Sequence, residues 1–377
     1  MITVGGTNGK GSCVAYLEAM LSAAGYRVGA YTSPHLLRYN ERIRVAGTMI
    51  SDVALCTVFQ RIESARGDVP LTYFEYGTLA ALATFQEAKL DAVLLEVGLG
   101  GRLDAVNMID ADVALVASIG IDHTDWLGPD RESIGHEKAG IFRAGKPVVC
   151  GDPEPPQSLI RQADILRTPL FQLNRQFHID KHELSWNWLG WESRRQGLPL
   201  PRLRGTVQLH NAASCIAVLQ LLDERLPVSD EAIGLGLHKA SVPARFQLVD
   251  GAVPVILDVA HNAEACAALA QNLETSAGNG RTFAVAGMLR DKPLAAIGRV
   301  MDAQVDAWYL GSLRVAGREL DATELAQALA ISGEVSCHDS VPLAFAAAQA
   351  EARPGDRIVV FGSFHTVEAV LRLLSDG

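Results

Sequence analysis

This chain of 377 residues lacks the features that place a protein in a membrane or an oxidising compartment. It has no uncharged apolar run close to the ~18 to 20 residues that span a bilayer. Its first residues lack a basic flank followed by an apolar core and a cleavage site. Its six cysteines form no CxxC pair and mostly have apolar neighbours, so we expect buried, reduced thiols. We therefore expect a cytoplasmic protein.

The chain also lacks an excess of positive charge. Its 33 Lys and Arg residues face 43 Asp and Glu residues, which gives a net charge of −10. Nucleic acids and anionic membranes are bound by clustered cations, so we expect neither kind of partner. With 49% hydrophobic and 20% charged residues, the composition is that of a globular enzyme, and the length suits two domains.

The most informative segment runs from Ile2 to Ser12, where a short apolar run enters a glycine-rich turn that carries one lysine. Glycines let backbone N–H groups turn toward an anion, the following helix favours negative charge at its start, and the lysine neutralises phosphate oxygens. Val4 and Gly11 stand where the common phosphate-loop pattern has Gly and Ser or Thr. We expect a nucleotide triphosphate site, and a merely structural glycine turn is the alternative.

Strand-like and helix-like segments alternate along the chain, which predicts a doubly wound α/β sheet with ligands beyond the carboxyl ends of its strands. In the first part, strands are predicted at 2–4, 27–31, 91–97 and 111–118, and helices at 14–24, 51–65, 74–88 and 131–142. The helical pattern stops near Pro243, where a second α/β series begins. We therefore predict an ATP-binding domain at 1–242 and a smaller domain at 243–377, with a cleft between two lobes.

Polar residues follow several predicted strands and could carry chemistry. Glu96 ends one strand; a lone strand-end Glu is more often structural, but beside a phosphate loop it is a plausible Mg²⁺ ligand. Asp122 and His123 follow another strand, where a simple turn is the alternative. Imidazole is an unusual Mg²⁺ ligand, so the residue chemistry by itself favours Asp122.

Further candidate residues lie in both predicted domains. Lys138 lies on a predicted helix, and the pattern alone favours an ordinary solvated lysine. In the second domain, Asp258 ends a strand, and Asn262 is placed to cap the helix that follows. His261 is either a structural histidine with its hydrogen bonds made inside the protein, or a residue that faces the predicted cleft.

Several motifs in this order resemble those of the folylpolyglutamate synthases and bifunctional dihydrofolate synthases of the Mur ligase superfamily. They lie at 6–12, 32–36, 72–76, 96–107, 122–128, 258–262 and 362–367. The resemblance implies a P-loop ATPase domain of Mur ligase type followed by a smaller Rossmann-like α/β domain, with Mg-ATP bound between them. Family members usually carry a further segment before the phosphate loop, including part of the pterin-binding surface. We expect that this segment is absent here. Either the start site is set too late, or the sequence is a fragment, or the protein has lost part of its dihydropteroate site.

The resemblance also implies roles for individual residues. It implies ATP contacts from Thr7, Asn8, Gly9, Lys10, Gly11, Ser12, Asn211, Arg245 and Asp258. It implies a Mg²⁺ site at Ser33, Glu96 and His123. It implies pterin-substrate contacts from Thr72, Tyr73, Phe74, Glu75, Leu103, Asp104 and Ala105. Lys138 matches a lysine that CO₂ converts to a carbamate, and Lys10, Lys138 and His261 are the catalytic candidates.

The reaction implied is ATP-dependent joining of L-glutamate to dihydropteroate and to reduced folates through an acyl phosphate, by a protein expected to be a monomer. Lys10 and Mg²⁺ would stabilise the transferring phosphoryl group, and His261 is a conceivable base. Three alternatives stay open: polyglutamylation of tetrahydrofolate only, a UDP-muramyl ligase, and a non-catalytic nucleotide-binding regulator.

Overall fold

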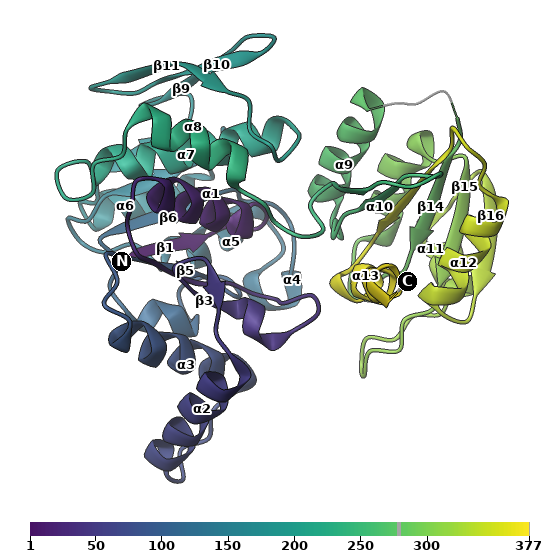
Figure 1. Cartoon of the computed structure of the whole chain (residues 1–377), viewed down its shortest axis with the longest axis horizontal. Coiled ribbons are helices and arrows are strands. Elements are labelled where there is room, and N and C mark those ends of the chain that lie inside the picture. Colours follow the sequence, from purple (N-terminus) through teal and green to yellow (C-terminus); the bar gives the residue numbers. More distant parts are fainter. Residues whose placement is uncertain (277–279, 377) are drawn as a thin grey trace. The chain divides into compact units, whose positions relative to one another are not determined.

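The computed structural model describes residues 1–276 and 280–376, which fold as two compact units, Met1–Val242 (unit 1) and Pro243–Gly377 (unit 2). Each unit is a largely parallel sheet covered by helices, as Figure 1 shows, so the predicted α/β class is confirmed. Within the described ranges, no helix is both long and apolar enough to cross a membrane.

Unit 1 contains eleven strands and eight α-helices within the described chain. The strands are β1 (Ile2–Gly5), β2 (Val28–Tyr31), β3 (Ile43–Val45), β4 (Thr48–Met49), β5 (Ala92–Glu96), β6 (Val113–Val116), β7 (Val148–Cys150), β8 (Leu170–Gln172), β9 (His178–Lys181), β10 (Ser185–Leu189) and β11 (Arg194–Pro199). The helices are α1 (Lys10–Ala23), α2 (Asp52–Arg66), α3 (Tyr73–Glu87), α4 (Thr124–Leu127), α5 (Arg131–Ala139), α6 (Gln157–Ile165), α7 (Thr206–Leu221) and α8 (Asp230–Lys239), with 3₁₀ turns η1 (Tyr39–Arg42) and η2 (Ala105–Met108).

The main sheet of unit 1 has the order β4-β3-β2-β5-β1-β6-β7-β8. The six strands β2, β5, β1, β6, β7 and β8 are parallel. Side chains of a strand alternate between faces, so each strand feeds two cores. Ile2 and Val4 pack with α1, α7 and α8, while Leu95 and Val116 pack with α2, α3, α5 and α6 on the other face. The parallel order brings the carboxyl ends of β2, β5, β1 and β6 side by side.

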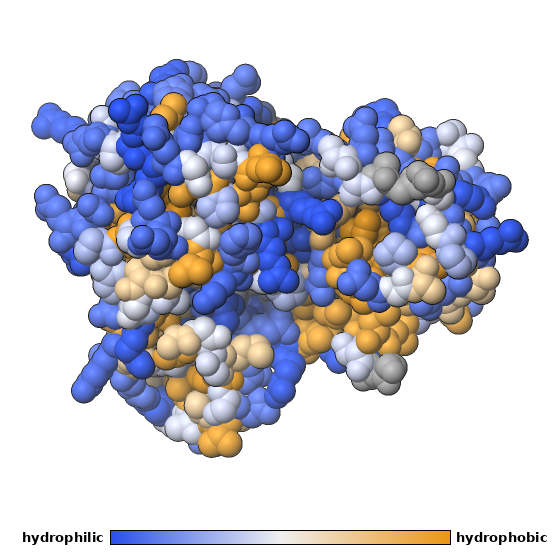
Figure 2. Space-filling view, turned by 45° about the horizontal axis from the view of Figure 1, so that its top comes forward, coloured by the Kyte–Doolittle hydropathy of each residue, from blue (hydrophilic) through white to orange (hydrophobic). Residues whose placement is uncertain are grey.

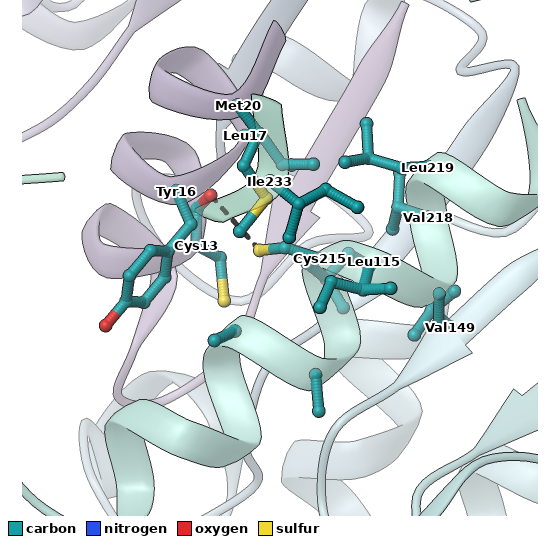
Figure 3. Close-up of a cluster of buried hydrophobic side chains, with 14 of the residues drawn as sticks. Cys13, Tyr16, Leu17, Met20, Leu115, Val149, Cys215, Val218, Leu219 and Ile233 are labelled. Atoms are coloured by element: carbon teal, nitrogen blue, oxygen red, sulfur yellow. Dashed lines mark hydrogen bonds between the residues drawn. The ribbon is translucent and has the colours of Figure 1, made fainter. Parts of the chain in front are cut away.

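The first helix, α1, is anchored in the core of unit 1. Figure 3 shows its apolar side chains interlocked with those of α7, α8, β6 and β7. The thiol of Cys215 on α7 donates to the carbonyl of Cys13 at 3.4 Å. Helix α1 ends just before Gly25, whose φ of 93° suits glycine, as predicted.

The segment 178–199 contains Trp186, Trp188 and Trp191 and forms a small antiparallel sheet of order β11-β10-β9. Trp186 and Trp188 are fully buried, and the Trp188 indole donates to the Ala213 carbonyl of α7 at 3.0 Å. These rings are therefore core residues of unit 1. On the surface, hydrophilic side chains cover most of the face of unit 1 seen in Figure 2.

Unit 2 is a six-stranded sheet of order β12-β13-β17-β14-β15-β16, parallel except for β12. Its strands are β12 (Gln247–Val249), β13 (Val255–Leu257), β14 (Thr282–Ala286), β15 (Ala307–Gly311), β16 (Glu334–His338) and β17 (Arg357–Phe361). Its helices are α9 (Ala263–Thr275), α10 (Leu294–Met301), α11 (Ala322–Leu329), α12 (Val341–Glu351) and α13 (Phe364–Asp376), with the 3₁₀ turn η3 (Asp302–Gln304). This arrangement is the predicted Rossmann-like fold.

Two details differ from the sequence prediction. Cys56 and Cys337 are exposed, because Cys56 lies on the outer side of α2 and Cys337 on the edge strand β16, whereas the other four thiols are buried as expected. The helix predicted at 131–142 ends at Ala139, since the chain turns at Gly140 to pass close to another loop.

The contact between α1 and α8 generates a stability prediction. A Cβ added to Gly236 would lie 2.7 Å from the backbone nitrogen of Met20, whereas a Cβ at Gly234 on the same helix would meet Pro199 at 3.6 Å, an ordinary contact. Gly236→Ala should therefore lower the free energy of unfolding by about 1 to 3 kcal/mol. Gly234→Ala should raise it by up to about 1 kcal/mol, because alanine favours a helix.

Urea unfolding of both variants checks the opposite signs. Equal stabilisation by the two substitutions would mean that α1 and α8 do not pack in this way.

Candidate active site

The glycine-rich loop between β1 and α1 is shaped to receive an anion. Gly9 precedes α1 with a φ of 84°, and a Cβ there would lie 2.6 Å from the side-chain oxygen of Asn211. Only glycine fits this position. Lys10 folds back over the loop, and its ammonium donates to the carbonyls of Gly6 at 2.9 Å and Thr7 at 3.2 Å. The loop thus combines the positive end of α1 with a lysine ammonium, as a phosphate site requires.

The loop is braced from the side by the chain that follows β6. The Thr7 amide donates to the Ser118 carbonyl at 2.8 Å, and the Asn8 amide donates to the Ser118 hydroxyl at 3.0 Å. The Thr7 hydroxyl both donates to the Gly120 carbonyl and accepts from the Gly120 amide, each at 3.0 Å. Four residues from two strand ends therefore form one hydrogen-bonded layer.

On its other side the loop meets helix α7. The hydroxyl of Ser12 is buried and accepts from the side-chain amide nitrogen of Gln208 at 3.2 Å. The side-chain amide nitrogen of Asn211 donates to the side-chain oxygen of Gln208, also at 3.2 Å. The structure thus brings the predicted ATP-binding residues Ser12 and Asn211 together through Gln208. Sequence reasoning missed Gln208, although it lies one helical turn before Asn211.

Glu96 and Ser33 end adjacent parallel strands and meet at the carboxyl edge of the sheet. Glu96 is 4% exposed, and its carboxylate accepts from the Ser33 amide at 3.1 Å. A Cβ on Gly11 would lie 3.8 Å from both carboxylate oxygens, so Glu96 faces the first turn of α1. A buried carboxylate beside a phosphate loop is a donor of the kind that Mg²⁺ prefers.

His123 stands in a left-handed turn with a φ of 54°, directly before α4. Its backbone amide donates to the carboxylate of Asp122 at 2.8 Å, and its ring is 40% exposed while the Asp122 side chain is 7% exposed. Across residues 1–276 and 280–376, no three His, Cys, Asp or Glu side chains gather around one point. A site for Mg²⁺ needs no such cluster, because phosphate oxygens and water fill most of its positions.

Lys138 is buried, with 3% of its surface exposed, so the prediction of a solvated lysine is wrong. Burial first and the nearby charge of Lys10 second lower the pKa of Lys138 to about 7, while the charge of Asp122 opposes the shift. The amine is therefore largely neutral just above neutral pH.

Close backbone contacts explain why Lys138 is buried. A Cβ at Gly101 would lie 2.9 Å from the Glu137 carbonyl, and one at Gly140 would lie 2.4 Å from the Cα of Arg102. Glycines at both positions let the end of α5 press against the loop after β5. This contact joins residues far apart in the chain, so the local pattern around Lys138 does not reveal it.

The predicted substrate residues lie on two adjoining segments, the first turn of α3 and the loop after β5. Thr72 and Glu75 form a capping box, in which the Thr72 amide donates to Glu75 at 2.6 Å and the Glu75 amide donates to Thr72 at 3.2 Å. The ring of Phe74 would be 2.6 Å from a Cβ on Gly98, so the two segments touch. Tyr73 is 62% exposed and is available to a ligand.

Asp104 holds the loop after β5 in shape. Its carboxylate accepts from the amides of Gly98 and Leu99 at 2.9 Å and from Val106 at 3.0 Å. Burial raises the pKa of Asp104, while those hydrogen bonds and the charge of Lys10 act to lower it. Leu103 before it is 80% exposed, and Ala105 begins η2.

An aromatic pocket adjoins these segments and was not predicted. It has a volume of about 520 Å³ and is lined by Tyr39, Phe59, Gln60, Glu63, Tyr73 and Tyr76. Of these residues, sequence reasoning selected Tyr73 as a substrate contact. The others come from η1, α2 and α3, which are brought together by folding.

In unit 2, the predicted residues gather after β13. The carboxylate of Asp258 accepts from the amides of Phe246 and Ala260, each at 2.8 Å. Burial raises the pKa of Asp258, while the charge of Arg245 opposes the shift. Arg245 also stacks on the Phe364 ring at 5.8 Å.

His261 lies beside this group, with its Nδ1 2.7 Å from the Val259 carbonyl. Asn262 accepts from the Ala265 amide at 2.9 Å and caps α9, as predicted. The structure thus places Arg245, Asp258 and His261 at one end of the unit 2 sheet.

Comparisons with known proteins agree with this geometry. The Mur ligase middle domain matches residues 4–150, and the Mur ligase glutamate ligase domain matches residues 244–364. A dihydrofolate synthase/folylpolyglutamate synthase of Escherichia coli K12 is 46% identical over 374 residues, which cover 99% of this chain and 86% of that protein.

Solved structures give the same result. E. coli FolC in complex with DHPP and ADP superposes with a TM-score of 0.94 at 46% identity, over 100% of this chain and 88% of that one. A bifunctional folylpolyglutamate synthase/dihydrofolate synthase with Mn, AMPPNP and L-glutamate bound superposes with a TM-score of 0.92 at 47% identity, over 99% of this chain and 89% of that one. This chain therefore belongs to the Mur ligase family, in the group of the dihydrofolate synthase/folylpolyglutamate synthases.

Proposed function

We propose that this protein is an ATP-dependent amide ligase that joins L-glutamate to dihydropteroate and to reduced folates. The observation that carries the proposal is the phosphate loop with its Lys10 ammonium, set beside the buried Glu96 carboxylate at the edge of the unit 1 sheet. Family membership supplies the acceptors, because relatives of this chain carry these activities in their names.

The reaction needs a leaving group, because a carboxylate is a poor acyl donor. The γ-phosphoryl group of ATP passes to a carboxylate oxygen of the pterin substrate and forms an acyl phosphate, with release of ADP. The glutamate amine then attacks the carbonyl carbon, an amide bond forms, and phosphate leaves. Lys10 stabilises the charge on the transferring phosphoryl group, and the loop amides fix its position.

The residues at the sheet edge fit a divalent cation. Glu96, the Ser33 hydroxyl and His123 are the groups that we propose to hold Mg²⁺, with Asp122 as a neighbouring carboxylate. Bound there, the ion would neutralise phosphate oxygens and help to orient ATP. Solved relatives contain Mn with AMPPNP, which supports a divalent ion and a nucleotide.

Lys138 has the properties of an amine that captures CO₂. A neutral amine attacks CO₂, a C–N bond forms, one proton leaves, and the product is an anionic carbamate. The pKa of about 7 keeps enough neutral amine for this step. The carbamate would place an anion beside Lys10, and we propose that it supports the metal site.

We also propose roles for the remaining predicted residues. Arg245 and Asp258 bind ATP, as do Asn211 and the loop residues 7–12. His261 is a candidate base for the glutamate amine, and Tyr73, Phe74 and Leu103 contact the pterin. The backbone-bound Thr72, Glu75 and Asp104 shape these segments, and Ala105 completes the substrate surface.

Incubation of the protein with Mg-ATP, L-glutamate and either dihydropteroate or tetrahydrofolate tests the activity. Mass spectrometry should find one added glutamate on dihydropteroate and one or more on tetrahydrofolate. Glutamylation of tetrahydrofolate alone would restrict the function to polyglutamylation. If neither acceptor gained glutamate while a UDP-muramyl substrate was extended, the proposal would be wrong.

The phosphate loop generates a prediction for Lys10. Lys10→Ala should lower kcat at least about a hundredfold, because the variant loses the cation that the phosphate loop would offer to the transferring group. The fold should persist, since the Lys10 ammonium donates to the carbonyls of Gly6 and Thr7 in its own loop. Lys181→Ala, on an exposed strand position, is the matched control and should keep wild-type kcat. Wild-type turnover by Lys10→Ala would refute the assignment.

The pKa of Lys138 generates a pH prediction. Its neutral amine is abundant above pH 7 and decreases tenfold for each pH unit below, so the carbamate should form at pH 8 and be lost near pH 6 at a fixed pressure of CO₂. NMR with ¹³CO₂ measures the carbamate signal directly. The Lys138→Met variant, which lacks the amine, is the control. No difference between the two proteins at pH 8 would exclude the modification.

A further inference from the structure

Ile119 lies between two sets of hydrogen bonds in unit 1. Its neighbours Ser118 and Gly120 bond to the phosphate loop, as described above. Ile119 itself bonds in another direction: its amide donates to the Asp152 carboxylate at 2.8 Å, and its carbonyl accepts from the Arg131 guanidinium at 2.8 Å. The segment that supports the phosphate loop is therefore itself held by an ion pair.

The pair between Arg131 and Asp152 has close geometry. One terminal nitrogen of Arg131 contacts both carboxylate oxygens of Asp152 at 3.0 Å and also donates to the Glu154 carbonyl at 3.0 Å. The Asp152 side chain is 6% exposed and the Arg131 side chain is 38% exposed. Hydrogen bonds between ionised groups in a poorly solvated place are stronger than neutral ones, so this pair resists displacement.

The pair also joins three parts of the candidate site. Asp152 follows β7, and Arg131 is the first residue of α5, which carries Lys138 about two turns further along. Asp122 and His123 come shortly after Ile119 in the chain. The phosphate loop, the predicted metal residue His123 and Lys138 therefore share one anchor.

We propose that Arg131 and Asp152 are positioning residues that shape the phosphate loop for Mg-ATP before the nucleotide binds. They act through Ile119, which fixes Ser118 and Gly120 and, through them, the amides of Thr7 and Asn8. The inference rests on the proposed function, in which this loop binds ATP. Preorganisation of the loop lowers the cost of ordering it on binding, so the pair contributes to nucleotide affinity.

The chemistry of the pair suggests two variants. Asp152→Asn keeps the shape but removes the charge that Arg131 needs. Arg131→Lys keeps the charge, but its ammonium donates from a single point and cannot reach Ile119, Asp152 and Glu154 together. Asp230→Asn is the matched control, because Asp230 pairs with Arg195 in the same unit but between β11 and α8.

The experiment measures the Kd for Mg-AMPPNP by calorimetry, at a temperature well below the Tm of each protein. Asp152→Asn and Arg131→Lys should each raise this Kd about tenfold, the effect of losing one hydrogen bond to a charged group. Asp230→Asn should change it less than about twofold. The KM for L-glutamate should stay unchanged in all three, which a general loss of structure would not allow.

Hydrogen exchange supplies a readout independent of catalysis. The amides of Thr7 and Asn8 should exchange faster in the two test variants than in the wild type or in Asp230→Asn. Unchanged Kd with unchanged exchange, or an equal rise of Kd in the control, would overturn the proposal.

Two further results are also decisive. If Asp152→Asn does not fold, Arg131→Lys, whose side chain is more exposed, provides the test. If the wild-type protein does not bind Mg-AMPPNP, the proposed function fails, and the exchange of Thr7 and Asn8 alone decides whether the pair positions the loop.

Discussion

The hydrogen bonds between the glycine-rich loop and the end of β6 are the interaction on which the candidate site depends. They hold Thr7 and Asn8 against Ser118 and Gly120, and so fix the path of the loop as it enters α1. A loop without this support would leave several backbone groups to water and would have to be ordered by the nucleotide itself. The parallel order of β1 and β6 makes the contact possible, because adjacent parallel strands end at the same edge.

Electrostatics decides what the rest of this edge can do. Lys10 and Lys138 lie close enough that the charge of one lowers the pKa of the other, and burial acts in the same direction on Lys138. Two ammonium groups would repel one another, whereas a neutral amine or a carbamate at Lys138 removes that conflict. Glu96 supplies a buried carboxylate that faces the first turn of α1. The unit 1 site can therefore balance the charge of a nucleotide and a metal ion.

Much of this architecture could be predicted from local patterns. Buried apolar runs indicated β2, β5 and β6, and the glycine turn before a helical pattern indicated the phosphate loop. The burial of Lys138 could not be predicted, because it depends on backbone contacts that Gly101 and Gly140 allow across the fold. The ion pair between Arg131 and Asp152 and the hydrogen bonds of Gln208 could not be predicted for the same reason, because tertiary contacts bring these residues together.

The central claim is that the loop delivers the γ-phosphoryl group of ATP to a substrate carboxylate. The most direct measurement uses dihydropteroate with ¹⁸O in its carboxylate, together with Mg-ATP and L-glutamate, and mass spectrometry of the phosphate released. An acyl phosphate passes one substrate oxygen to phosphate when the amine attacks, so phosphate should carry one ¹⁸O for each amide formed. Amide formation with unlabelled phosphate would contradict the account.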